Sequence, residues 1–201
     1  MERRMFTLPA FVIFFFLTPA SVSPQTAVSQ RAQDEQRLDY ARTVFTQLIG
    51  SEDKARTLVA KLDTYHYDAP WQLSTLLTIA QRMLVKEWKA EDIPPLFWAC
   101  GDAAAAIDGD DEKFAEIVAA IVAIKTGHTS EVDSLLNELE ELGLPAFKLV
   151  AEAIGKTPAD VRRLAKADRI VPSVTARILL DQFARRYEGL ANKLARQRKE
   201  P

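Results

Sequence analysis

The spacing of apolar residues constrains the fold of this chain more than any other feature of its sequence. From Leu38 to Leu139 these residues recur every three or four positions, which is the spacing of one face of an α-helix. Glycine, proline and capping residues divide the pattern into short segments, and no stretch alternates as a β-strand does. The sequence therefore predicts an all-α fold, a compact multi-helix bundle or orthogonal array of about eight to nine short helices.

The boundaries of these helices follow from their caps and from their apolar stripes. Gly50 ends the first helix and Ser51 caps the second, while Thr157-Pro158 has the hydroxyl and the N1 proline of another helix start. A last helix is expected over residues 172–199, with Gly189 as a site of bending or breakage. The inward stripes are Leu38, Ala41, Val44, Phe45 and Leu48; Ala55, Leu58, Val59 and Leu62; Leu73, Leu76, Leu77, Ala80 and Leu84; Phe114, Ile117, Val118, Ile121 and Val122; and Val132, Leu135, Leu136 and Leu139.

A hydrophobic leader stands at the N-terminus. Arg3 and Arg4 precede an apolar run that peaks at residues 11–17, and small or polar residues follow. This order is typical of a secretory signal peptide, and the run is shorter than the roughly 20 residues that a membrane-spanning helix needs. We expect residues 1–23 to be a signal peptide, cleaved after Ala20 or after Ser23. An uncleaved anchor and an artefact of start-codon choice are the alternatives.

The rest of the chain divides into a linker and one domain. Residues 24–36 are polar and are expected to form the linker, and residues 37–199 are expected to form a single helical domain. If the leader is a signal peptide, the protein is secreted or periplasmic. No second long apolar run follows the leader, so we expect no membrane contact by the body.

Composition and motifs argue against catalysis and against nucleic-acid binding. The chain carries a net charge of −2, and without its first 30 residues it holds 24 basic and 27 acidic side chains, which leaves no cationic excess for a phosphate backbone. One cysteine, Cys100, and two histidines without ligand spacing build no metal site. The sequence contains no phosphate-binding, dinucleotide-binding or nucleophile-elbow motif. We predict a protein that is not an enzyme and has no catalytic residue, cofactor or metal.

The aromatic residues of the region 65–98 offer the remaining functional signal. Trp88 has charged neighbours throughout residues 86–89, so we expect it to be exposed, and an exposed tryptophan is a common anchor for a protein partner. Trp71 and His66 belong to an aromatic cluster and are the other candidates for partner contact. The competing interpretation is that this cluster is part of the core.

A series of short motifs follows in a distinctive order and spacing over residues 37–195. They are Val44 to Ala55, Leu62 to Trp71, Gly101 to Ala106, Ile121 to Gly127, Glu138 to Pro145, Leu149 to Val161, Asp168 to Val171, and Tyr187 to Gly189. In this order the motifs resemble the N-terminal helical region of phage tail tape measure proteins. Asp168 departs from the family pattern, which has a glycine there.

The resemblance implies a protein that lies inside a phage tail tube and sets its length during assembly, with tail-tube or tail-assembly proteins as partners. That role needs a long helical rod, because each helical residue adds about 1.5 Å. The chain ends just after the resembling region, so we expect a prophage-derived or truncated assembly domain. The leader departs from the family, whose members assemble in the cytoplasm. A phage tail or the host cytoplasm is therefore the alternative location.

Two other functions compete with the assembly domain. The first is a secreted or periplasmic helical protein-binding domain with no role in a tail. The second is an enzyme, which a pocket gathering Asp102, Glu152 and a histidine would support. We rank the enzyme last.

Overall fold

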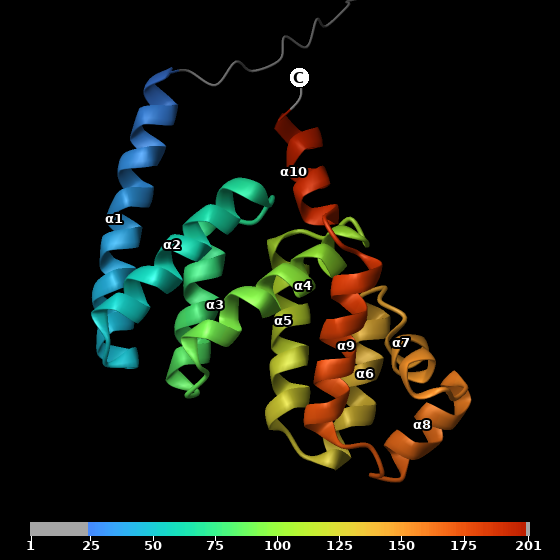
Figure 1. Ribbon diagram of the computed structural model, residues 1–201. Coiled ribbons are helices and arrows are strands. Elements are labelled where there is room, and N and C mark those ends of the chain that lie inside the picture. Colours follow the sequence, from blue (N-terminus) through green and yellow to red (C-terminus); the bar gives the residue numbers. More distant parts are fainter. Residues whose placement is uncertain (1–23, 200–201) are drawn as a thin grey trace, which may run out of the picture.

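The computed structural model describes residues 24–199, with side chains over 29–198, and its elements there are all helical (Figure 1). The all-α fold class is therefore confirmed for this part of the chain. The α-helices are α1 (Pro24–Ile49), α2 (Glu52–Asp68), α3 (Leu73–Val85), α4 (Ile93–Ala105), α5 (Asp111–Thr126), α6 (Val132–Glu141), α7 (Ala146–Ile154), α8 (Pro158–Lys166), α9 (Pro172–Arg186) and α10 (Leu190–Lys199), with 3₁₀ turns at Ala90–Asp92 and Thr129–Glu131.

The described residues form ten α-helices, slightly more than the eight to nine expected. The last predicted helix is interrupted at Gly189, which has a φ of 74° and so lies in the left-handed region that glycine adopts readily. The chain therefore breaks there instead of bending, and α10 leaves the end of α9 in a new direction (Figure 1).

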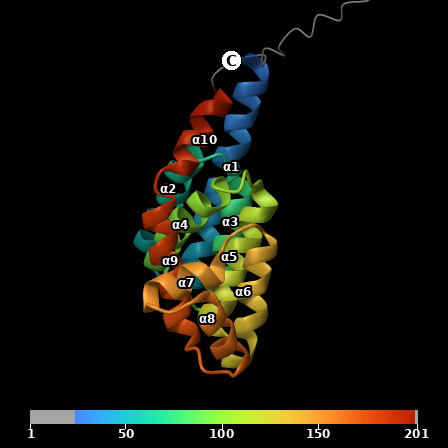
Figure 2. The same cartoon turned by 90° about the vertical axis from the view of Figure 1, so that its right-hand side faces the viewer.

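Helix α4 lies at the centre and joins two groups of helices. It packs against α2 on one side and against α5 and α9 on the other (Figure 1). Helices α7 and α8 cover α6 and α9 at the far side of the molecule, which faces the viewer in Figure 2. Most residues of α4 are buried, because the helix has neighbours on several sides.

The predicted helix starts are confirmed by the hydrogen bonds that satisfy their first N–H groups. The Ser51 hydroxyl accepts a hydrogen bond from the Lys54 N–H at 3.4 Å. Thr157 and Asp160 form a reciprocal capping box around Pro158, which occupies the first turn of α8. Such caps each stabilise a helix by about 1 kcal/mol, and here they also fix where two turns end.

The prediction of a linker at residues 24–36 is wrong, because this segment is the first half of α1. After Pro24 it contains no glycine or proline, and its alanine, glutamine, arginine and glutamate residues have high helix propensity. Its polar composition reports exposure to solvent, and the described side chains before Leu38 are indeed mostly exposed.

Two further expectations concern the same end of the chain. Leu48, predicted to point inward, is 41% exposed, since the α1 stripe that packs inward is made by Leu38, Ala41 and Phe45. The signal peptide expected at residues 1–23 lies outside the described residues. Within the described part, no helix combines the length and the apolar character needed to cross a membrane.

Helices α2 and α4 approach each other closely at Gly101. The Tyr65 hydroxyl donates to the Phe97 carbonyl oxygen at 2.9 Å and accepts from the Trp71 indole N–H, also at 2.9 Å. A Cβ atom at Gly101 would lie 1.7 Å from that hydroxyl oxygen and 2.7 Å from the indole nitrogen. Position 101 therefore accommodates only glycine while Tyr65 and Trp71 keep these hydrogen bonds.

We predict that Gly101→Ala lowers the free energy of unfolding by about 1–3 kcal/mol, because the added methyl group overpacks a buried joint. Urea denaturation measures this loss. Tyr65→Phe removes the atom that the methyl group meets first, so Gly101→Ala should cost less in a Tyr65→Phe background than in the wild type. An alanine variant within about 0.5 kcal/mol of the wild type would contradict the packing at this joint.

Candidate functional site

Trp88 lies inside the fold, so the prediction that it is exposed is wrong. Only 9% of the residue is accessible to solvent. Glu87, with a φ of 61°, turns the chain back after α3, and the Trp88 ring then lies under the Lys125 ammonium group, 3.9 Å from the ring centroid. Lys125 also pairs with Asp92 at 3.8 Å. Trp88 thus joins the end of α3 to the end of α5, and its ring is too buried to contact a protein partner.

Trp71 and His66, the other two candidates for partner contact, are engaged in internal contacts. Trp71 is 1% exposed and stacks on Phe114 with ring centroids 5.0 Å apart, so its prediction as a partner contact is wrong. His66 is half-buried, and its Nδ1 lies 2.8 Å from the Trp71 carbonyl oxygen. Because a carbonyl oxygen only accepts, Nδ1 carries the proton there. The competing interpretation, an aromatic cluster belonging to the core, holds for Trp71.

The interior acid Asp102 has a structural role. Its carboxylate accepts the Gly189 N–H at 3.0 Å and the Ala191 N–H at 2.9 Å, and so caps the N-terminus of α10. Burial raises the pKa of Asp102, although these two hydrogen bonds act in the opposite direction. The neighbouring Cys100 thiol is fully buried, and burial raises its pKa as well.

Asp102, Glu152 and His66 each bind a different partner, so they do not form the group that would support an enzyme. Glu152 pairs with Arg186 at 2.6 Å and with Lys148 at 3.9 Å, while Asp102 binds the start of α10 and His66 binds the Trp71 carbonyl. In the described part of the chain, no three histidine, cysteine or carboxylate side chains gather closely enough to ligate a metal ion.

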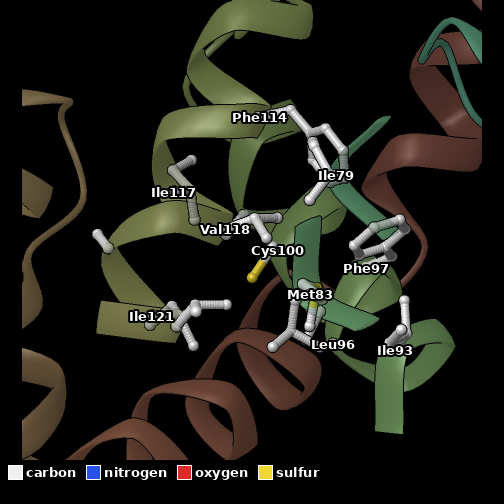
Figure 3. Packing of buried hydrophobic residues seen from close by; sticks show 14 of the residues in the cluster. Ile79, Met83, Ile93, Leu96, Phe97, Cys100, Phe114, Ile117, Val118 and Ile121 are labelled. Carbon is white, nitrogen blue, oxygen red and sulfur yellow. The ribbon is translucent and has the colours of Figure 1, made fainter. Parts of the chain in front are cut away.

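An apolar groove of about 530 Å³ lies between α3 and α5. Its floor is formed by buried side chains of both helices, and Figure 3 shows Ile79, Met83 and Val118 reaching inward toward Cys100 of α4. Val85 stands at the edge of the groove and is 63% exposed, so it extends the apolar surface of the groove outward. Another hollow, between α2 and α4, is lined largely by charged and hydroxyl side chains and by two prolines.

A second groove, of about 440 Å³, lies on the other side of α5, against α6. The ridge between the two grooves is made of small side chains, since Ala119 and Ala123 line both of them. We call the surface formed by these two grooves and the ridge the docking face. Its apolar part comprises Ile79, Met83, Val85, Ala115, Val118, Ala119, Val122, Ala123, Leu135 and Leu142, and its charged edges are Arg82, Lys86, Glu116, Glu138 and Glu141.

The basic and acidic side chains of the docking face are segregated on opposite edges of it. Arg82 and Lys86 stand on the α3 side, whereas Glu138 and Glu141 stand on the α6 side with Glu116 of α5 next to them. All five side chains are exposed. None of them forms an ion pair with another described residue, although other charged side chains of the molecule do. The face therefore presents an apolar strip between a basic edge and an acidic edge.

The signal for the docking face was present in the sequence of α5. Residues 114–124 contain a single charged residue, Glu116, so the helix is apolar on nearly all sides. A helix of this kind is normally covered all round, whereas an amphipathic helix leaves a polar side outward. The outward alanines, at a spacing of four residues, therefore indicate that α5 has an apolar face outside the core as well as one inside it.

No known protein family, curated protein or solved structure compared with this chain matches it.

We predict that Ala119→Lys and Ala120→Lys have very different effects, although the residues are neighbours. Ala119 is exposed on the ridge, so at protein concentrations low enough to keep the chain monomeric a lysine there should change the free energy of unfolding by less than about 0.5 kcal/mol. Ala120 is 3% exposed, and a lysine there should cost about 1–3 kcal/mol, because its long side chain overpacks a buried position of α5. Thermal and urea unfolding compare the two variants. Equal losses would contradict the outward orientation of the ridge.

A second prediction concerns the pH dependence that Asp102 contributes. Its pKa is raised in the folded state, so folded protein holds this proton more tightly than unfolded protein does. Its contribution to stability therefore increases as pH falls through the raised pKa toward the ordinary value of about 4. Asp102→Asn lacks this titration. Parallel urea titrations should show the wild type gaining stability relative to Asp102→Asn on acidification. A difference that is constant with pH, or that moves the other way, would contradict the raised pKa.

Proposed function

We propose that this chain is a non-enzymatic structural or assembly domain that binds protein through its docking face. The observation that carries the proposal is the pair of apolar grooves on either side of the α5 ridge. Apolar strips with charged edges are the surfaces on which amphipathic helices dock. Alanine on the ridge supports this use, because small side chains let a second helix backbone approach closely.

The resemblance to the N-terminal region of phage tail tape measure proteins supports the assembly role over other kinds of binding. That resemblance includes Gly101 and Asp102, which in this fold serve the α2–α4 joint and the cap of α10. The buried polar groups described above are likewise held by structural hydrogen bonds. These structural roles support an activity on the surface, in a prophage-derived domain whose proposed partners belong to tail assembly.

The second candidate is a secreted or periplasmic protein-binding domain without a tail role. The observation that favours it is the signal-peptide pattern of residues 1–23. Both candidates use the docking face and differ in compartment and partner. N-terminal sequencing of the protein from its own cell separates them, since cleavage after Ala20 or after Ser23 supports export and an intact leader in the cytoplasm supports the assembly domain.

We predict that a photo-crosslinking amino acid at position 119 captures a protein chain in the cell that encodes this protein. The same amino acid at Ala60, on the exposed side of α2, serves as the matched control. Mass spectrometry identifies the captured chain. A tail protein or a second copy of this chain supports assembly, and an envelope protein supports the second candidate. A crosslinking yield at position 119 no higher than at position 60 would contradict the use of the docking face.

A further inference from the structure

Helices α3 and α5 run side by side in the same direction along the docking face. At their starts the Gln72 N–H donates to the Asp111 carboxylate at 2.8 Å, and at their ends the Lys125 ammonium covers the Trp88 ring. Helix α6 runs the opposite way, because only a short turn around Thr129–Glu131 separates it from α5. The three helices stand side by side in Figure 1, with α5 between α3 and α6.

Arg82 and Glu138 lie at the same height along α5, on opposite sides of it. Arg82 is ten residues beyond Gln72, and Ile121 is ten residues beyond Asp111, so Arg82 is level with the segment around Ile121 if each residue rises about 1.5 Å. Glu138 borders its groove together with Ala119 and Ala120, which belong to nearly the same turn of α5.

The charge pattern of the docking face is complementary to that of a second copy of the same face. Rotation by half a turn about an axis that lies in the face and runs along α5 exchanges the α3 side for the α6 side and keeps the heights unchanged. The basic edge of one copy then meets the acidic edge of the other, with Arg82 opposite Glu138 in two equivalent places. The exposed Val85 comes to lie opposite the partly buried Leu135, so the apolar edges also meet.

The other way of placing two copies face to face brings like charges together. Rotation about an axis perpendicular to α5 within the face keeps α3 over α3 and reverses the heights. Arg82 and Lys86 then face the basic edge of the second copy, and Glu138 and Glu141 face its acidic edge. Juxtaposed like charges oppose association, so charge selects the arrangement with the two α5 helices parallel.

We propose that the occupant of the docking face is a second copy of this chain, which packs as a two-fold dimer with parallel α5 helices. This inference rests on the proposed function and names the partner. The alanine ridges of the two copies lie against each other, each copy covers the apolar grooves of the other, and the Arg82–Glu138 pairs close the two edges.

Exchange of charge between two variants tests the dimer. Arg82→Glu places a second carboxylate opposite Glu138 at both edges, and Glu138→Lys places an ammonium group opposite Arg82 at both edges. Each variant alone should dimerise at least about tenfold more weakly than the wild type. An equimolar mixture forms a heterodimer that keeps one native Arg82–Glu138 pair and gains one pair of reversed sign, so its affinity should be about that of the wild type. Analytical ultracentrifugation of the full chains measures all four cases, and the unchanged leader is common to them.

Arg177→Glu is the matched control, because Arg177 is exposed on α9 with no ion pair to another described residue. It should dimerise as the wild type does, and circular dichroism melts should show all variants folded. A wild type that is monomeric up to about 100 μM, or single variants that dimerise as tightly as the wild type, would overturn the dimer. A mixture no tighter than its components would do the same. A monomeric chain that still crosslinks another protein at position 119 leaves the proposed function in place and removes only the second copy as partner.

Discussion

The close approach of α2 to α4 at Gly101 is the contact on which the rest of the structure depends. Because position 101 has no side chain, the Tyr65 hydroxyl reaches the Phe97 carbonyl oxygen and still accepts the Trp71 indole N–H. These bonds fix α2, and the turn that follows it, to the central helix. The next residue, Asp102, caps α10, so two consecutive positions of α4 contact α2 and the start of α10.

The position of α4 also explains why α5 has a free side. Helix α5 uses one side against α4 and α9 and is flanked by α3 and α6, which leaves its alanine ridge between two grooves. Trp88 and Lys125 keep α3 beside α5 although the two helices touch little along their length. The docking face is thus a consequence of packing around a central helix, and its charges are sorted because α3 and α6 carry opposite signs there.

Local signals in the sequence were sufficient for the helices and insufficient for the surface. The period of apolar residues and the caps at Ser51 and Thr157 depend on neighbours within one or two turns, so they predicted elements correctly. The sequence predicts the wrong place for Trp88 because the residue that covers it, Lys125, is remote in sequence and belongs to the last turn of another helix, α5. The polar composition of residues 24–36 predicts a linker, but that composition reports exposure to solvent and not disorder, and the segment is helical. The apolar character of α5 was visible, but the edges of its face depend on which helices adjoin it.

The most direct test of the closed docking face is a pair of distances between two copies in solution. Cysteine introduced at Glu112 or at Thr126, near the two ends of α5, takes a spin label, while the native Cys100 is buried and unreactive. Pulsed dipolar spectroscopy should find both label pairs at similar short separations, because parallel helices keep equal residues together. An antiparallel pair would instead separate equal residues at both positions by the 14-residue offset, about 20 Å along the helix axes. That larger separation, or the absence of any dipolar signal, would contradict the account.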